Sequence, residues 1–218
     1  MKSCVLWVQT RCWHGDMRIP PGRPDFSQTH SLQECTRAQL LWLLQQEGFA
    51  GITRVDGDIC EWQRRHDYRP TGLRDIGRMV CFEQTIEEYG VEQEYFERWV
   101  REPIVAGQYL ACQTGEQEKL KILVRAGEHF LYFRPRIIGQ GEAERLWAEV
   151  RAMRATDDAL RMLADFEISF GVVDEVSGWR ILHSTLPWRE GCVLPLEGNW
   201  VDLDDGDDKN GRRLCLNG

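Results

Sequence analysis

The sequence predicts a mainly β protein in which an antiparallel meander closes into a barrel, with a helix near 37–47 and a helical segment near 142–163. Between residues 50 and 134, short strand-like runs alternate with turn signals at nearly even spacing, which is typical of a meander. About nine or ten such strands would leave exposed edges in an open sheet, and closure removes them. A barrel of this size leaves room for one small ligand.

The strands are expected in the following order. Residues 4–10 form the first strand, a turn follows at His14-Gly15, and 16–19 is a short extended piece that ends at Pro20-Pro21. Asp56-Gly57 predicts a hairpin turn between two later strands. The later strands are expected at 51–55, 58–69, 75–83, 93–100, 106–113, 119–125, 128–134, 165–173, 178–185, 198–203 and 211–216.

Two segments carry helical signals. Thr36 and Gln39 match a capping box at the start of the first helix, and Gly48 is expected to end it. A break is expected near Thr156-Asp157 in the second segment, whose apolar stripe consists of Leu146, Trp147, Val150 and Met153. The chain is expected to form a single domain, 1–218, with 139–141 as the best boundary if it divides.

Composition argues against several classes of partner. The formal net charge of −8 disfavours binding to nucleic acid or to an anionic membrane, because phosphate groups need a concentrated cationic face. The sequence has no run of about 20 apolar residues that would span a bilayer. The apolar run at the start of the chain ends at Gln9 and is too short for a signal peptide, so a cytoplasmic location is expected.

The sequence predicts neither a metal site nor a cofactor. The eight cysteines include no Cys-x-x-Cys pair, which favours free thiols over disulfides or zinc. The acidic run Asp202–Asp208 resembles a calcium loop, but Arg213 stands where the last ligand, a Glu, belongs. The chain also lacks a Gly-x-Ser-x-Gly elbow and a glycine-rich phosphate loop.

Three features together resemble the lipocalin-like, or calycin, β-barrels. They are the N-terminal strand with Trp7, the meander of 51–134, and the tryptophan in Ser184-Thr185-Leu186-Pro187-Trp188-Arg189. The lipocalin Gly-x-Trp opening is absent, because Val5 stands at the position of the glycine. The resemblance is architectural, and it implies an internal ligand site without identifying the ligand.

The strand that begins near Cys60 suggests where this site lies. Strict alternation places Trp62, Arg64, His66 and Tyr68 on one face, so aromatic and charged groups are mixed there. The opposite face is uniformly polar, and outward aromatic residues would leave an exposed apolar patch. We therefore expect Trp62 and Arg64 to bind a ligand inside the barrel, His66 to exchange a proton and Tyr68 to donate a hydrogen bond. The alternative is that this face of the strand points outward.

Other residues extend this candidate site. Arg78 alternates with apolar neighbours and is expected either on the cationic floor of the pocket or in an ion pair with Asp16 or Glu97. Arg18 shares a face with Asp16, as a pair at the rim or the mouth of the pocket. Trp7 is expected among the ligand-binding residues.

His183 completes the candidate acid–base groups. It is expected as a hydrogen-bonded core residue or, if it faces the same cavity as His66, as its acid–base partner.

Three functional hypotheses follow. The first is a small-molecule-binding barrel whose ligand is modest in size and anionic or aromatic, because aromatic walls accompany Arg64 and Arg78. The second is a cofactor-independent lyase or isomerase that uses His66, Tyr68 or His183 for proton transfer. The third is a protein-interaction module with a filled barrel. The oligomeric state is not determined by the sequence.

Overall fold

Seven consecutive antiparallel strands form the larger of two sheets, which we call sheet A. The structure is a computed structural model, and it describes residues 3–101, 108–115, 119–174, 176 and 178–203. Each strand pairs with the next in the chain, as a meander requires. The strands are β1 (Cys4–Gln9), β2 (Trp13–Ile19), β3 (Glu47–Asp56), β4 (Ile59–Asp67), β5 (Ile76–Cys81), β6 (Thr85–Gly90) and β7 (Phe96–Val100).

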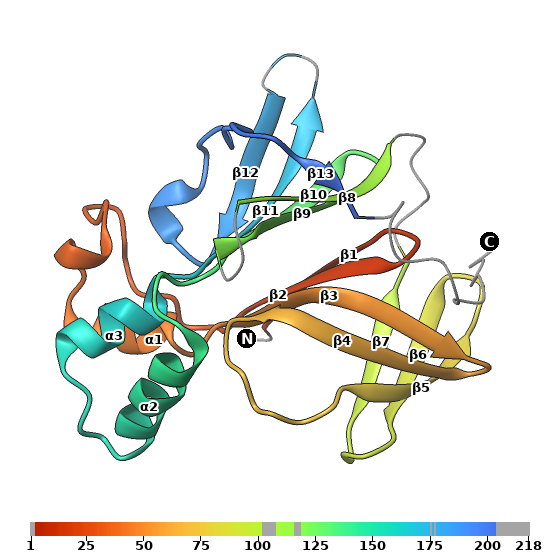
Figure 1. Cartoon of the computed structure of the whole chain (residues 1–218), viewed down its shortest axis with the longest axis horizontal. Coiled ribbons are helices and arrows are strands. Elements are labelled where there is room, and N and C mark those ends of the chain that lie inside the picture. Colours follow the sequence, from red (N-terminus) through yellow and green to blue (C-terminus); the bar gives the residue numbers. More distant parts are fainter. Residues whose placement is uncertain (1–2, 102–107, 116–118, 175, 177, 204–218) are drawn as a thin grey trace.

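A second antiparallel sheet, sheet B, packs against the first half of sheet A (Figure 1). Its strands lie in the order β12-β11-β10-β9-β8-β13, and β1 and β2 contact β9. The strands are β8 (Tyr109–Thr114), β9 (Lys121–Ala126), β10 (His129–Arg134), β11 (Glu167–Asp174), β12 (Gly178–Ser184) and β13 (Val201–Asp202).

Three helices lie together at one end of the two sheets (Figure 1). They are α1 (Arg37–Leu43), α2 (Gln140–Arg151) and α3 (Asp157–Ala164), with short 3₁₀ turns at Leu32–Glu34 and Pro187–Arg189. The capping box of Thr36 and Gln39 is confirmed, because each side chain bonds the backbone N–H of the other. The expected break in the second helical segment is also confirmed, since Thr156 caps α3.

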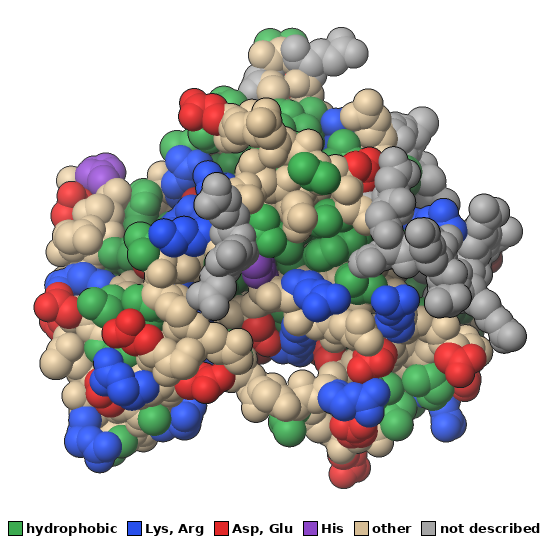
Figure 2. Space-filling model, in the orientation of Figure 1, with side chains coloured by type: hydrophobic (Ala, Val, Ile, Leu, Met, Phe, Trp, Pro, Cys, Tyr) green, Lys and Arg blue, Asp and Glu red, His purple; other side chains and the backbone are tan. Residues whose placement is uncertain are grey.

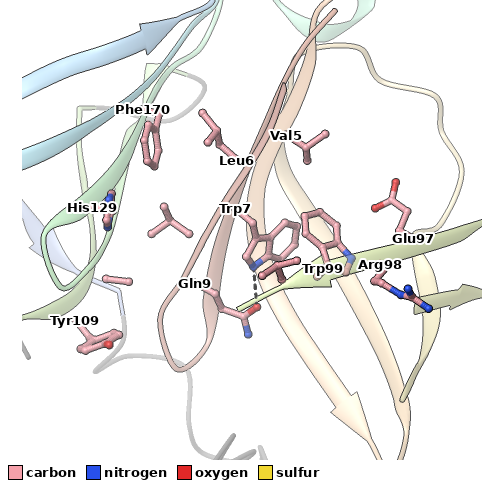
Figure 3. Close-up of a pocket in the computed structure, with 13 residues that line it drawn as sticks. Val5, Leu6, Trp7, Gln9, Glu97, Arg98, Trp99, Tyr109, His129 and Phe170 are labelled. Atoms are coloured by element: carbon pink, nitrogen blue, oxygen red, sulfur yellow. Dashed lines mark hydrogen bonds between the residues drawn. The ribbon is translucent and has the colours of Figure 1, made fainter. Parts of the chain in front are cut away.

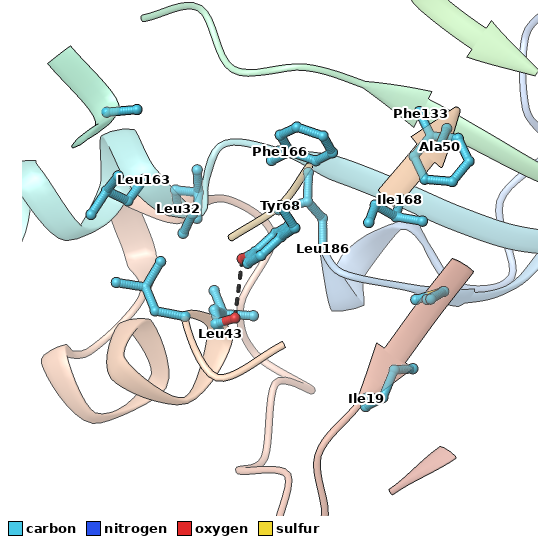
Figure 4. Close-up of a cluster of buried hydrophobic side chains, with 14 of the residues drawn as sticks. Ile19, Leu32, Leu43, Ala50, Tyr68, Phe133, Leu163, Phe166, Ile168 and Leu186 are labelled. Carbon is cyan, nitrogen blue, oxygen red and sulfur yellow. Dashed lines mark hydrogen bonds between the residues drawn. The ribbon is translucent and has the colours of Figure 1, made fainter. Parts of the chain in front are cut away.

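One apolar core joins the two sheets and the helices. Met17 of β2 belongs to this core. Phe133 of β10, Ile168 of β11, Leu43 of α1 and Leu163 of α3 are fully buried in it (Figure 4). Gly15 keeps the sheets close, because a Cβ atom there would lie 2.9 Å from the Phe133 ring. The core therefore occupies the space between the sheets.

The second face of sheet A encloses a separate space, which we call the lumen. The sheet curls so strongly that Trp7 of β1 contacts Trp62 of β4 and Trp99 of β7, at ring-centroid distances of 6.0 and 5.5 Å. The expected closure of the barrel is not found, because no strand pairing joins β1 to β7 among the described residues. Sheet A is an open half-barrel, and the coarser prediction of a mainly β, antiparallel fold is confirmed.

A β-bulge in β3 and β4 decides which side chains reach the lumen. Gly51 lies opposite Arg64 and Ala50 lies opposite His66, so Arg65 has no residue opposite it. This extra residue reverses the alternation beyond it. Arg64 therefore shares the lumen face with Trp62, whereas His66 points to the other side of the sheet.

Several local predictions need correction. His14-Gly15 is not a turn but lies within β2, and Gly48 does not end the first helix, because α1 ends at Leu43 and Gly48 belongs to β3. Strand β6 at Thr85–Gly90 was not expected, since Glu87 and Glu88 interrupt its apolar pattern. The expected strand 211–216 and positions 204–208 of the acidic run lie outside the described residues.

No helix among the described residues has both the length and the apolar character needed to cross a bilayer. The described cysteines, Cys4, Cys12, Cys35, Cys60, Cys81, Cys112 and Cys192, are free thiols.

Replacing Gly51 by alanine should destabilise the protein by about 2–3 kcal/mol, because an added Cβ would lie 1.9 Å from the Gln63 carbonyl oxygen. The free energy of unfolding in urea measures this. Gly141→Ala in α2 is the control, since a Cβ there meets nothing within 4 Å and alanine favours a helix. Equal stabilities of the two variants would contradict the importance of the bulge.

Candidate functional site

The lumen of sheet A holds a cavity of about 440 Å³. Its wall combines aromatic rings with acidic and basic groups contributed by most of the seven strands and by the β4–β5 connection. The lining residues are Trp7, Arg18, Glu47, Gly48, Phe49, Trp62, Arg64, Asp67, Arg69, Thr71, Leu73, Arg74, Asp75, Glu88, Gln93, Tyr95, Glu97 and Trp99. A volume of this size matches the cavities that hold small ligands.

Arg18 ties the two ends of the curled sheet together. Its Nε donates to Oδ1 of Asp16 at 3.1 Å, and its Nη1 donates to Oε1 of Glu97 on β7 at 2.6 Å. Asp16 is fully buried, and burial raises the pKa of its carboxyl to about 7 although Arg18 acts in the opposite direction. The predicted pair of Asp16 and Arg18 is present, and Arg18 lines the cavity.

Arg64, on β4, forms a second ion-pair cluster in the lumen. Its Nη1 and Nη2 donate to Asp67 at 2.9 Å and Asp75 at 2.7 Å, and its guanidinium lies 3.7 Å from the ring centroid of Phe49. The Nε atom of Arg64 is buried and has no hydrogen-bond partner among the described residues. Two carboxylates thus neutralise Arg18 and another two neutralise Arg64.

Glu88 differs from the other lumen carboxylates. It is 5% exposed, and it accepts hydrogen bonds from the Tyr95 hydroxyl at 2.7 Å and from Trp99 Nε1 at 2.8 Å. Both donors are neutral, and among the described residues no cationic side chain lies within ion-pair distance of Glu88. Burial, with a smaller contribution from the nearby charges of Glu97 and Asp75, raises the pKa of this carboxyl although the two hydrogen bonds lower it.

His14 supports the aromatic wall from behind. Its ring is fully buried and stacks on Trp7 at a centroid distance of 5.0 Å, and its Nδ1 lies 3.0 Å from the Thr53 hydroxyl. Burial, and secondarily the charge of Arg64, lowers the pKa of His14 to about 3. The imidazole is therefore neutral at physiological pH.

The seam between β1 and β7 is closed by side chains instead of backbone pairing. Trp7 and Trp99 lie side by side there, and Trp7 Nε1 donates to Gln9 at 3.1 Å (Figure 3). On the outer side of this seam, a wide groove runs toward sheet B and is bordered by Tyr109 and Phe170. Trp7 and Trp99 line both spaces.

The β4–β5 connection, residues 68–75, forms a strap over a window in the sheet. β5 pairs with β4 only from Ile59 to Glu61, so the rest of β4 has no strand beside it on that edge. The surface is hollowed at this place, between β4 and the strap (Figures 1 and 2). Arg64, Leu73 and Asp75 line both the lumen cavity and a second cavity of about 990 Å³ behind the window.

The structure divides only some of the residues that the sequence placed together, since Trp62, Arg64 and His66 all line the second cavity. Trp7, Arg18, Trp62 and Arg64 all line the lumen cavity. His66 lies across the sheet in the second cavity, where its Nε2 bonds the Leu120 carbonyl and burial lowers its pKa. The bulge at Gly51 is the reason for this separation.

Tyr68 is also outside the lumen. It is fully buried in the core beside Phe166, and its hydroxyl donates to the Leu43 carbonyl at 3.0 Å (Figure 4). Burial raises the pKa of this phenol to about 12. The expected common face of Trp62, Arg64, His66 and Tyr68 is thus wrong beyond Arg64.

Arg78 and His183 lie elsewhere. Arg78 is 62% exposed on the outer face of sheet A, and it pairs with Asp58 at 3.5 Å instead of Asp16 or Glu97. Its apolar neighbours Val80 and Phe82 are exposed as well, so the apolar alternation did not mark the inner face. His183 lies on β12 in sheet B, stacked on Phe170, and does not face His66.

The residues of the site that sequence reasoning missed include Phe49, Asp67, Asp75, Glu88, Tyr95 and Trp99, together with His14 behind the wall. Glu97 and Trp99 alternate along β7 with exposed Phe96 and Val100, so the more apolar face of that strand is the outer one. An alternation rule selects the wrong face there. Among the described residues, no group of three His, Cys, Asp or Glu side chains is arranged to hold a metal ion.

Comparison with family models, curated proteins and solved structures finds no match to this chain. The likeness to lipocalin-like barrels consequently rests on the curled antiparallel sheet alone.

Arg18→Met should lower the free energy of unfolding by about 3 kcal/mol, because it leaves the buried Asp16 carboxylate without its cation. Adding Asp16→Asn should restore part of the loss. Arg98→Met removes an exposed arginine of β7 and should change stability by less than about 0.5 kcal/mol. A loss of the same size in both single variants would refute the bridging role of Arg18.

His14→Asn should flatten the acid limb of stability against pH. The folded-state pKa of about 3 lies below the unfolded value of 6.5, so between these values the unfolded chain binds more protons and stability falls as pH falls. Without His14, this slope should decrease by up to about 1.4 kcal/mol per pH unit. Urea titrations from about pH 6 to pH 4 measure it, with exposed His30→Asn as the control.

Proposed function

We propose that this protein binds a small, partly aromatic molecule in the lumen of the half-barrel. The observation that carries the proposal is the cavity of about 440 Å³, because a lumen that served only packing would be filled. Three indoles, from Trp7, Trp62 and Trp99, give it flat walls suited to an aromatic or unsaturated group.

The lumen is also preorganised. Arg18 and Arg64 are each held by two carboxylates, and Trp7 is fixed between His14 and Trp99. Side chains whose rotamers are already fixed lose little entropy when a ligand arrives. The same ion pairs remove the argument for an anionic ligand, since the arginines that suggested one already have partners.

A lumen ligand accounts for the unfilled space better than an interaction module, which needs a packed interior. The lyase or isomerase hypothesis requires two titratable groups near one ligand atom. His66, Tyr68 and His183 lie outside the lumen, so that hypothesis gains no support from this cavity. The lipocalin-like character of sheet A and the cytoplasmic location, both expected from the sequence, are further parts of this proposal.

A larger side chain in the lining of the lumen cavity tests whether the ligand binds there. Thr71 is an exposed residue of the strap, and it lines the cavity. Thr71→Phe should weaken the binding of a retained or screened ligand at least about tenfold by steric exclusion. Native mass spectrometry of the purified protein identifies a retained compound, and tryptophan fluorescence follows the binding of screened ones.

Gln28→Phe is the matched control, because Gln28 is exposed on a loop away from the cavity. Unfolding free energies should stay within about 0.5 kcal/mol in both variants. Ligand affinity that is identical in Thr71→Phe, Gln28→Phe and the unaltered protein would place the binding site outside the lumen.

A further inference from the structure

We propose that the lumen ligand carries an organic ammonium group, seated against Glu88 between the aromatic walls. This inference rests on the proposed function and specifies its ligand class. The chemical class is a quaternary or protonated amine on a small organic body. It replaces the anion that Arg64 and Arg78 beside aromatic walls suggested.

The first argument comes from the pairing of charges in the lumen. Arg18 lies between Asp16 and Glu97, and Arg64 lies between Asp67 and Asp75. Arg69 and Arg74, at the rim, pair with Glu47 and with Glu61 and Glu92. Each cation of the cavity lining therefore has a carboxylate beside it.

Glu88 is the carboxylate of the cavity lining for which these ion pairs provide no arginine among the described residues. Buried carboxylates are normally paired with a cation or coordinated to a metal. Among the described residues, Glu88 has only the neutral donors Tyr95 and Trp99, and no metal-binding group of side chains is present. A ligand cation would supply the missing charge, whereas an anion would meet Glu88, Asp75 and Glu97 unfavourably.

The second argument comes from the aromatic side chains beside Glu88. Trp99 bonds Glu88 directly, and the end of the Trp62 ring lies beside the Glu88 side chain, because a Cβ added at Gly77 would lie 3.2 Å from Trp62 Cη2 and 2.9 Å from Glu88 Cγ. Indole faces attract cations through the ring quadrupole, and aromatic cages of this kind hold quaternary ammonium groups. Carboxylate and indoles thus converge on one wall.

Glycine at position 77 makes this convergence possible. Any larger residue there would displace Glu88 or Trp62 from the wall.

Choline and its neutral isostere 3,3-dimethyl-1-butanol test the charge requirement on the unaltered protein. Both have the same shape, so tighter binding of choline isolates the contribution of the positive charge. We expect choline to bind at least about tenfold more tightly, measured by calorimetry and by the fluorescence of the lumen tryptophans. Benzoate, an aromatic anion, should bind more weakly than choline.

Glu88→Gln should abolish the preference for choline over the neutral isostere. Glu87→Gln is the matched control, because Glu87 is the preceding residue on the outer face of β6, paired there with Arg98. It should leave choline binding unchanged. The comparison of the two isosteres on the unaltered protein remains decisive if Glu88→Gln does not fold.

The outcomes separate the two proposals. Equal affinity for the two isosteres, a preference for benzoate, or a preference for choline over the isostere that survives in folded Glu88→Gln would overturn the ammonium inference and leave the lumen site standing. If, in addition, no screened compound of any charge responds to Thr71→Phe, the proposed function fails as well.

Discussion

The structure of the lumen depends on the two ion pairs of Arg18. Sheet A has no backbone pairing between its first and last strands in the described part of the chain, so side chains must hold its curl. Arg18 does so by joining buried Asp16 on its own strand to Glu97 on β7, 79 positions along the chain. The neighbouring contact of Trp7 with Trp99 seals the same seam with apolar surface. These side-chain contacts join the two ends of the curled sheet around the cavity.

Burying so many charges in a half-barrel is costly, and the arrangement of partners shows how the cost is offset. Arginine guanidinium groups each serve two carboxylates, with geometry that favours several hydrogen bonds at once. Asp16 and Glu88 lie at the two extremes: Asp16 contacts a cation, whereas Glu88 has only neutral donors among the residues that the structure describes. A buried carboxylate without a counter-charge is a candidate for binding a ligand cation, and Glu88 therefore supports the proposed ammonium group, whereas the lumen site itself rests on the cavity.

The fold was largely readable from the sequence, whereas the site was readable only in part. Turn signals such as Asp56-Gly57 and the capping box at Thr36 act locally, and the structure contains both. Trp62 and Arg64 were found because alternation holds up to the bulge. His66 and Tyr68 were misplaced because one extra residue reverses that alternation. Arg78 was misplaced because its apolar neighbours are exposed.

By itself the sequence determined the antiparallel strands, the helices and a strand that mixes aromatic and charged side chains. These are properties of nearest neighbours, fixed by backbone propensity and local hydrogen bonds. Only the tertiary structure decided which face of each strand became the lumen, which carboxylates neutralised Arg18 and Arg64, and which one remained. Those outcomes depend on how strands far apart in the chain meet when the sheet curls. Contacts between such distant residues leave no periodic pattern in the sequence.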